Sequence, residues 1–321
     1  MRVRKLLAYA AIYVLWGGSF LAIREIVGAA ASGQSVPPFF AAGFRFTLAG
    51  LILLIWSRLT GPISLSPRQL YGASLLGLIM FTCLYAGLFW AEIRIASGVA
   101  AVISAMIPVW IFAGEVFLLR TQRATALSLT GIALGFLGVV VLAVHSSPGA
   151  TPAHTSTLAV FVTVAGTICW SAGTLLSRRL ALPRPQKANA GWQMFSGGFL
   201  LLLLSAAAGE FRRLPPTAIL LSPRVLVSMA YLVVAASIVA YTAYVWIIAH
   251  DSPTRVSSYA YVNPVFALIL GATLAGERLA PLQLAGTALV LAGVVATLMG
   301  KQTPAPQPHS VDEEQATSAS R

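Results

Sequence analysis

Ten runs of mainly apolar residues, each about as long as a lipid bilayer is thick, occupy most of the chain. A helix that crosses the hydrocarbon core of about 30 Å needs about 20 such residues. Only 9% of the residues are charged and 58% are apolar, whereas roughly a quarter of the residues of a soluble domain are charged. The sequence therefore predicts an all-α, polytopic membrane protein with ten transmembrane helices. The runs lie at residues 6–28, 38–56, 70–90, 95–119, 125–144, 157–180, 190–209, 225–249, 254–275 and 280–299.

The second half of the chain repeats the first. Residues 121–142 align without gaps to residues 276–297, and nine of the 22 positions are identical. Upstream, two further landmarks recur at almost the same offset, with Trp16 matching Trp170 and Pro108 matching Pro264.

These matches divide the chain into two five-helix halves, residues 1–145 and 157–300. Because five is an odd number, the two halves are expected to cross the membrane in opposite directions. Inverted repeats of this kind build many secondary transporters, with the substrate site at the repeat interface.

Basic residues stand singly or in pairs at the ends of the apolar runs, although the net charge of +12 would also suit a nucleic-acid binder. With a cytoplasmic N-terminus, thirteen Lys and Arg residues lie inside and six outside, which favours two cytoplasmic termini. We therefore expect contact with membrane lipid and not with nucleic acid. Residues 301–321 lack the apolar content to fold and are expected to form a disordered cytoplasmic tail.

Motifs for catalysis and metal binding are missing from the sequence. It contains no HExxH, GxSxG or P-loop pattern, and its four histidines are scattered without ligand spacing. We therefore expect no catalytic residue, no metal and no cofactor. Cys83 and Cys169 fall inside predicted membrane helices, where we expect small buried apolar residues and no disulfide framework.

Several stretches together resemble the EamA branch of the drug/metabolite transporter superfamily. They are LWGGSFLAIREIV, VPPFFAAGFRFTLAGLIL, WAEIRIASGVAAVISAMIPVW and SSYAYVNPVFALILGATLAGERLAPLQLAG. The resemblance covers nearly all of residues 5–300 and is greatest to ten-helix exporters of the bacterial inner membrane. It implies a central cavity, open to one side at a time and lined by helices one, three, four, six, eight and nine. Glu277 stands where the family has an acidic residue before the last helix, but the matching position of the first half is Gln122.

Polar and aromatic side chains at helical spacing predict the walls of that cavity. Hydroxyl groups could instead bond to their own helix backbone, and aromatic rings could simply pack or form an interfacial belt. The residues that we expect to face the cavity are Tyr13, Trp16, Tyr85, Glu92, Ser104, Thr167, Trp170, Thr174, Tyr241, Tyr244, Tyr261 and Asn263.

Four residues in the predicted helices each allow more than one structural interpretation. Pro108 and Pro264 each remove a backbone donor, which predicts either a substrate-facing helix break or a simple kink. Glu92 could carry a proton or meet a cationic substrate, or it could be a solvated charge beside Arg94. Arg45 could extend its charged end outward to the membrane surface, or it could pair with an acid or with a substrate carboxylate, and we expect a structural pairing.

The sequence thus predicts a secondary transporter that exports a small metabolite or drug by alternating access. Amino acids, purines or nucleosides, and aromatic cations fit the predicted walls about equally, and a proton is a candidate coupling ion. A facilitative channel-like or antiport carrier of the same fold is the alternative, and a membrane receptor or enzyme fits less well. The sequence is also compatible with a homodimer.

Overall fold

A computed structural model describes residues 2–28, 35–62, 65–144, 156–248, 250–251, 256, 259–276 and 280–300. The tail predicted at 301–321 lies outside the described residues. The first half contains α1 (Arg2–Gly17), α2 (Ser19–Val27), α3 (Pro38–Leu59), α4 (Pro67–Leu76), η1 (Gly77–Cys83), α5 (Leu84–Ala91), α6 (Ser97–Ser104), α7 (Ile107–Ala113), η2 (Gly114–Leu118) and α8 (Ala126–Val144). The second contains α9 (Thr157–Leu176), α10 (Gln186–Ala207), η3 (Glu210–Arg213), α11 (Thr217–Leu220), α12 (Pro223–Ala230), η4 (Tyr231–Val239), α13 (Ala240–Ile248), α15 (Tyr259–Leu274) and α16 (Pro281–Met299).

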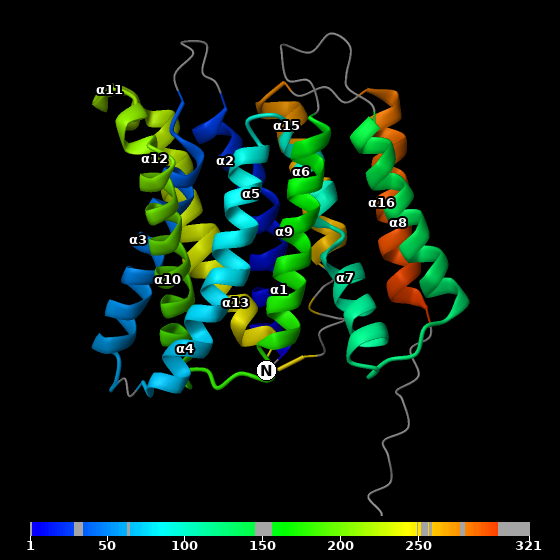
Figure 1. Ribbon diagram of the computed structural model, residues 1–321, viewed down its shortest axis with the longest axis horizontal. Coiled ribbons are helices and arrows are strands. Elements are labelled where there is room, and N and C mark those ends of the chain that lie inside the picture. The colour runs from blue at the N-terminus through cyan, green and yellow to red at the C-terminus, as the bar shows by residue number, and fades with distance from the viewer. Residues whose placement is uncertain are drawn as a thin grey trace, which may run out of the picture.

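These elements join end to end into upright helices (Figure 1). Eight of them are long and apolar enough to cross a membrane, and two shorter apolar helices cover Ala126–Leu142 and Val262–Leu274. One helix therefore lies on each of the ten predicted runs, and the all-α membrane fold is confirmed. The N-terminus and the end of α16 lie on the same face of the bundle (Figure 1), as an even number of crossings requires.

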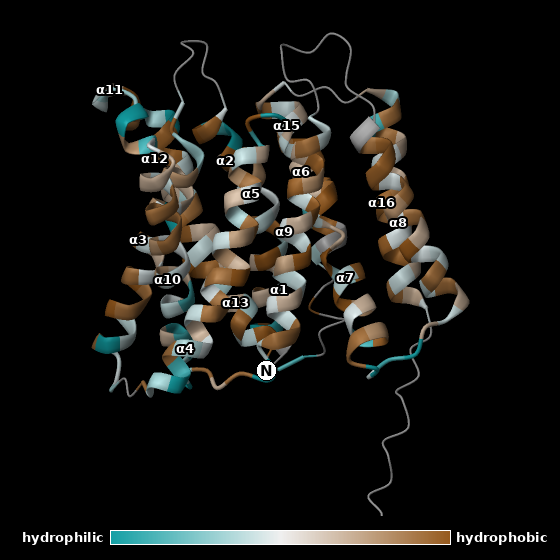
Figure 2. Cartoon of the chain, in the orientation of Figure 1, coloured by the Kyte–Doolittle hydropathy of each residue, from teal (hydrophilic) through white to brown (hydrophobic). Residues whose placement is uncertain are grey.

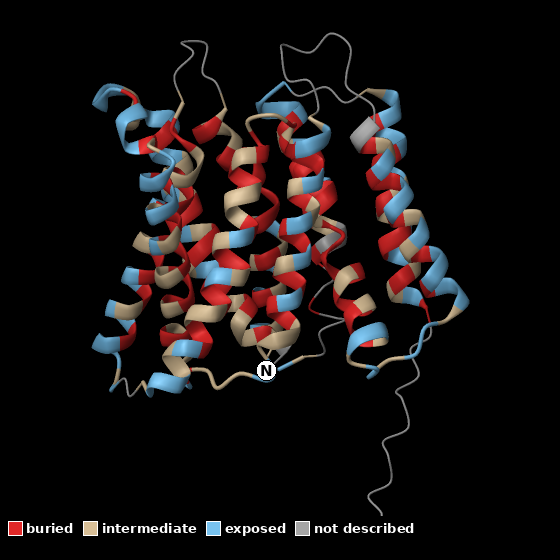
Figure 3. Cartoon of the chain, in the orientation of Figure 1, coloured by how far each residue is buried: buried red, intermediate tan, exposed pale blue. Residues whose placement is uncertain are grey.

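The surface of the bundle is apolar, as a lipid environment requires. Brown, hydrophobic stretches run along the full height of the helices in Figure 2, and many of them carry the exposed residues of Figure 3. Phe136 on α8 is 55% exposed and Ile269 on α15 is 55% exposed. Polar side chains such as Thr163, Thr167 and Gln193 are instead buried between helices, as expected where the solvent is hydrocarbon.

Small residues let helices of the two halves pack closely. A Cβ atom on Gly198 of α10 would overlap the backbone nitrogen of Thr47 on α3, and one on Gly293 of α16 would overlap the backbone nitrogen of Gly135 on α8. Such contacts between small residues are the usual basis of helix association in lipid, where apolar side chains gain nothing by leaving the solvent. The pairs α3·α10 and α8·α16 therefore join one half of the chain to the other.

The helix around Pro108 is interrupted, as one of the two readings predicts. α6 ends at Ser104, α7 begins at Ile107, and Pro108 occupies the first turn of α7. Pro264 differs, because α15 continues through it and the expected break is absent. Pro264 is only the sixth residue of α15, so its ring removes a single hydrogen bond next to the first turn, whose N–H groups have no helical partner in any case.

Three π-helical segments, η1, η2 and η4, were not expected from the sequence. η1 lies within the third membrane helix and η4 within the eighth, at matching places in the two halves. A π-helical turn shifts the side chains that follow it around the helix axis, and such turns are frequent at functional sites. Tyr85 and Tyr241 each follow one of these segments.

Candidate functional site

The two tryptophans that match between the halves meet in the middle of the bundle. Trp16 lies on α1 and Trp170 on α9, and the centroids of their rings are 6.1 Å apart at an interplanar angle of 88°. Both side chains are buried, and the Trp16 indole nitrogen donates to the carbonyl of Ala236 on η4, 3.0 Å away. An edge-to-face pair of equivalent residues thus marks the interface of the repeats.

Tyrosines from the second half complete this cluster. The Trp16 ring lies 5.3 Å from that of Tyr244 on α13 and 5.1 Å from that of Tyr259 on α15. Tyr241, one turn before Tyr244, lies 6.2 Å from Trp170 and donates from its hydroxyl to Gln193 Oε1 at 2.7 Å. Four helices of both halves therefore contribute rings to one buried group.

The first half adds Phe81 of η1 and Tyr85 of α5. Their ring centroids lie 6.0 Å and 6.4 Å from that of Trp170. Hereafter the central aromatic cluster means Trp16, Phe81, Tyr85, Trp170, Tyr241, Tyr244 and Tyr259.

A cavity of about 50 Å³ lies beside the central aromatic cluster. Five of the predicted cavity residues line it, together with Pro264; the five are Trp16, Tyr85, Ser104, Trp170 and Asn263. The remaining lining residues are Ser19, Phe20, Leu84, Leu88, Ala101, Ala105, Ile107 and Tyr259. Its walls are therefore mainly apolar, with a few polar groups. In the described part of the chain, no cluster of three His, Cys, Asp or Glu side chains is close enough to hold a metal ion.

The amide of Asn263 holds two elements of the cavity wall together. The side-chain amide is oriented so that both its oxygen and its nitrogen face suitable hydrogen-bonding groups. Its nitrogen then donates to the carbonyl of Tyr13 at 2.9 Å and to that of Tyr259 at 3.3 Å. Asn263 therefore ties α15 to α1. The side chain of Tyr13 itself points to Tyr9, with ring centroids 5.8 Å apart, and does not line the cavity.

The hydroxyl groups of α9 bond mostly within the protein. Thr167 donates to the carbonyl of Val164 at 2.6 Å and accepts from the Trp110 indole at 3.0 Å. Thr174 donates to the carbonyl of Trp170 at 2.9 Å and lies 3.4 Å from the Tyr244 hydroxyl. Thr174 therefore contacts the central aromatic cluster at Trp170 and Tyr244, whereas Thr167 bonds to Trp110 outside it. The side chain of Tyr261 lies outside the described residues.

Sequence reasoning missed Tyr259 and Phe81. Tyr259 stands four residues before Asn263, so both face the same side of α15, and this spacing could have identified it. Phe81 gave no comparable signal, because it is one apolar residue in an apolar run and its direction depends on the π-helical register of η1.

Arg45 is fully enclosed in the bundle, 1% exposed. Its Nε donates to Ser237 Oγ at 2.9 Å, and the guanidinium carbon lies 4.4 Å from the ring centroid of Phe46 and 5.2 Å from that of Tyr85. The Nη1 atom is buried and has no acceptor among the described residues. Arg45 thus contacts a hydroxyl group and two rings, one of which belongs to the cavity-lining Tyr85. The pairing with an acid that we expected stays a prediction.

Glu92 follows α5 and is also buried, 0% exposed. The reading of Glu92 as a solvated charge beside Arg94 does not agree with this burial. Arg94 instead stacks on Trp90, with its guanidinium 3.9 Å from the ring centroid, and donates to the Trp90 carbonyl at 2.8 Å. Arg45 and Glu92 are therefore an ordinarily basic and an ordinarily acidic side chain that are both buried in the bundle.

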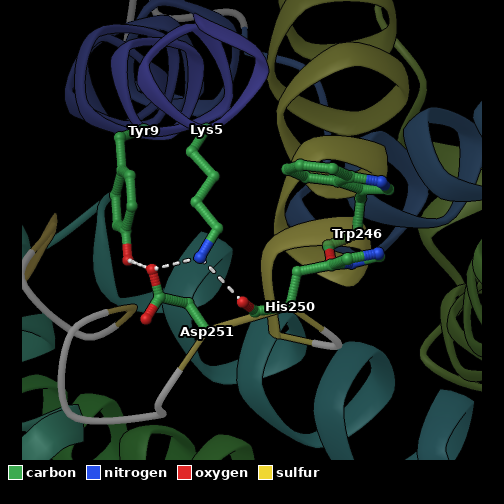
Figure 4. A network of polar contacts seen from close by, with 5 residues as sticks. All are labelled: Lys5, Tyr9, Trp246, His250 and Asp251. Atoms are coloured by element: carbon green, nitrogen blue, oxygen red, sulfur yellow. Dashed lines mark hydrogen bonds and ion pairs between the residues drawn. The ribbon is translucent and has the colours of Figure 1, made fainter. Parts of the chain in front are cut away.

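A polar network closes the end of the bundle at which the chain begins (Figure 4). Lys5 Nζ lies 3.2 Å from Asp251 Oδ2 and donates to the His250 carbonyl at 2.8 Å. The Tyr9 hydroxyl reaches the same carboxylate oxygen at 3.3 Å, while the His250 ring stacks on Trp246 with centroids 4.5 Å apart. The first helix is thereby bound to the end of the eighth.

Two arginines hold the opposite end of the first helix. Arg224, next to the start of α12, forms an ion pair with Glu25 of α2. Arg24 donates to the carbonyls of Glu92 at 2.7 Å and Ile95 at 2.8 Å. Polar contacts therefore join the first helix to its neighbours above and below the central aromatic cluster.

A model of the EamA-like transporter family matches residues 5–144 and 157–299. The inner membrane transporter YedA of Escherichia coli K12, named as uncharacterized, is 32% identical over 307 residues, which cover 94% of each chain. A probable amino-acid metabolite efflux pump of Salmonella typhimurium is 27% identical over 294 residues, covering 90% of this chain and 93% of the pump.

One solved crystal structure is similar in fold. It superimposes with a TM-score of 0.59 at 20% sequence identity and covers 92% of this chain and 97% of its own. The family model covers both halves of the chain, and the relatives align along nearly its whole length. The chain belongs to the EamA-like transporter family.

Proposed function

We propose that this protein exports a small organic metabolite or drug by alternating access, with the central aromatic cluster at the substrate site. The observation that carries the proposal is the meeting of Trp16 and Trp170, equivalent residues of the two halves, beside the cavity. In transporters built from inverted repeats, substrate binds near the midplane where the repeats meet.

The size of the cavity supports a mechanism in which the site must open. About 50 Å³ accommodates one or two water molecules, whereas pockets for small organic ligands are usually about 300 Å³ or larger. A metabolite can therefore enter only after the central aromatic cluster separates. Opening toward the chain's N-terminal face would also break the contact between Lys5 and Asp251.

The lining favours a substrate with a flat or apolar body and a few polar groups. Aromatic rings bind such bodies by stacking and bind cations at their faces, and Ser19, Ser104 and Asn263 supply polar atoms. Amino acids, purines or nucleosides, and aromatic cations remain the proposed classes. We put amino acids first among them, which the name of one relative, a probable amino-acid metabolite efflux pump, supports.

Counterflow in proteoliposomes tests the proposal. Vesicles with purified protein would be loaded with one class of solute and mixed with a trace of the same radiolabelled solute outside. Transient accumulation of label without an energy source is the expected result for at least one class. A steady conductance without counterflow would favour the channel-like alternative, and no accumulation of any class would contradict the proposed substrates.

We further propose that Glu92 couples protons to export. Its carboxyl is enclosed in the bundle, at the end of the helix α5 that carries the cavity-lining Tyr85 and Leu88. Replacing Glu92 with Gln is expected to abolish the response of transport to an imposed pH gradient, because an amide cannot release a proton. Uptake would be compared with and without the gradient, using Glu25→Gln as the control. Full pH dependence in Glu92→Gln would refute this coupling role.

The proposed location is the bacterial inner membrane, with both termini in the cytoplasm. This orientation rests on the excess of basic residues at one end of the helices. In a variant without native cysteines, a thiol at Gly61 is expected to react with a membrane-impermeant maleimide only after cell lysis. A thiol at Ser222, between α11 and α12, is expected to react in intact cells. The reverse pattern would invert the topology.

A further inference from the structure

The two cysteines of the chain, far apart in sequence, come from opposite halves of the fold. Cys83 ends η1 and Cys169 lies in α9, and both are free thiols. We infer that they form an oxidisable dithiol whose disulfide would lock the two halves together at the level of the central aromatic cluster. The effect on transport rests on the proposed function, whereas the formation of the disulfide does not.

Close contacts on either side of the cysteines fix the register of the two helices. A Cβ on Gly173 of α9 would meet Met80 of η1, and one on Gly166 would meet Leu84 at the start of α5. The helices run antiparallel here, since the residue number rises on one as it falls on the other. Cys83 and Cys169 lie between these two contacts and therefore opposite each other.

The side chains agree with this register. Cys83 is exposed on the surface of the bundle and Cys169 is half-buried beside it, so the expectation that both are buried apolar residues was wrong for Cys83. The backbones approach closely because glycines stand at the contacts, and a disulfide requires such an approach, with Cα atoms about 4.4–6.8 Å apart.

The location of the two cysteine thiols determines which kind of oxidant can reach them. Cys83 faces the region that lipid occupies around the bundle, so a lipid-soluble quinone can reach it while charged aqueous reagents cannot. In the reaction, both S–H bonds break and one S–S bond forms. The two electrons and two protons pass to the quinone, which becomes a hydroquinone.

The disulfide would act on the residues that line the cavity. Leu84, Tyr85 and Trp170 line the cavity. The first two directly follow Cys83 in the chain, and Trp170 directly follows Cys169. A covalent bond at this place prevents α5 and α9 from separating around Trp170. If the site opens by movement of one half against the other, the oxidised protein cannot complete the transport cycle.

The test treats the purified full-length protein, in proteoliposomes, with decylubiquinone. We expect a monomer that is lighter by two hydrogen atoms in intact-mass measurement and has no thiol left for alkylation after denaturation. Counterflow is expected to fall by about tenfold or more, because a conformational step limits the cycle, and to recover after reduction with dithiothreitol.

Matched variants separate the disulfide from other effects of the oxidant. Cys83→Ser and Cys169→Ser should each keep both their remaining thiol and their counterflow under the same treatment. In a variant that combines Cys83→Ser with Leu78→Cys, the second thiol is moved along η1 and no loss of hydrogen is expected.

Each failure has a distinct meaning. Thiols that stay open to alkylation in the native chain would overturn the dithiol. A complete disulfide with unchanged counterflow would overturn the lock. Absence of counterflow before oxidation would contradict the proposed function instead, and the mass measurement would still decide whether the dithiol exists.

Discussion

Replacement of Trp16 or Trp170 by alanine is expected to lower counterflow by about tenfold or more, because each removes a main wall of the proposed site. Each indole contacts rings of two or more other helices. Its removal therefore leaves a gap in the wall against which the substrate would stack. A lost stacking contact on an aromatic side chain costs about 1–3 kcal/mol in binding, and a cost of about 2 kcal/mol corresponds to about a 30-fold change in affinity.

The alanine variants also lose buried aromatic surface, which costs about 3–5 kcal/mol of stability for such residues. Trp16→Phe and Trp170→Phe keep most of that packing and separate the two effects. They should fold like the native protein and still transport more slowly. Phe136→Ala on α8 is the control, because this ring is 55% exposed and does not line the cavity. Normal counterflow in both tryptophan variants would place the substrate elsewhere.

Gly198→Val is expected to destabilise the protein by about 3 kcal/mol or more, or to prevent its recovery as a folded species. A Cβ at this position would overlap backbone atoms of Thr47 and Phe46 on α3. Backbone atoms of a helix cannot turn away as a flexible side chain can, so α10 and α3 would have to separate along their contact.

Gly61→Val provides the comparison, because nothing lies within 4 Å of the Cβ that it adds. Thermal unfolding of both variants in the same detergent would measure the difference. Equal unfolding temperatures for Gly198→Val and the native protein would mean that α3 and α10 do not pack as closely as described.

Length and hydropathy identified the ten membrane helices. An apolar run of about 20 residues has few structures open to it in lipid, since every backbone polar group must be bonded within the segment. The offset between the halves then identified Trp16 and Trp170 as equivalent residues, and they do meet in the fold. A repeat relates positions directly, so this conclusion did not depend on knowing how the helices pack.

Helix spacing alone did not tell cavity-lining side chains from their neighbours. Thr167 and Thr174 share a face with Trp170, but their hydroxyls bond to α9 itself and to neighbouring side chains. The spacing gives the face of a helix, whereas the partner of that face depends on its rotation against the next helix. That rotation follows from packing at residues such as Gly166 and Gly173, and from the π-helical turns η1 and η4.

The lipid environment, the number of membrane crossings, the inverted repeat and the family follow from the sequence alone. Each of these depends on the local composition of a segment or on similarity between segments. The packed fold was needed to establish that Glu92 is buried, that α15 continues through Pro264 and that Cys83 lies opposite Cys169. Each of these depends on contacts between helices that are distant in sequence, because in lipid close packing and interhelical hydrogen bonds fix how one helix lies against another.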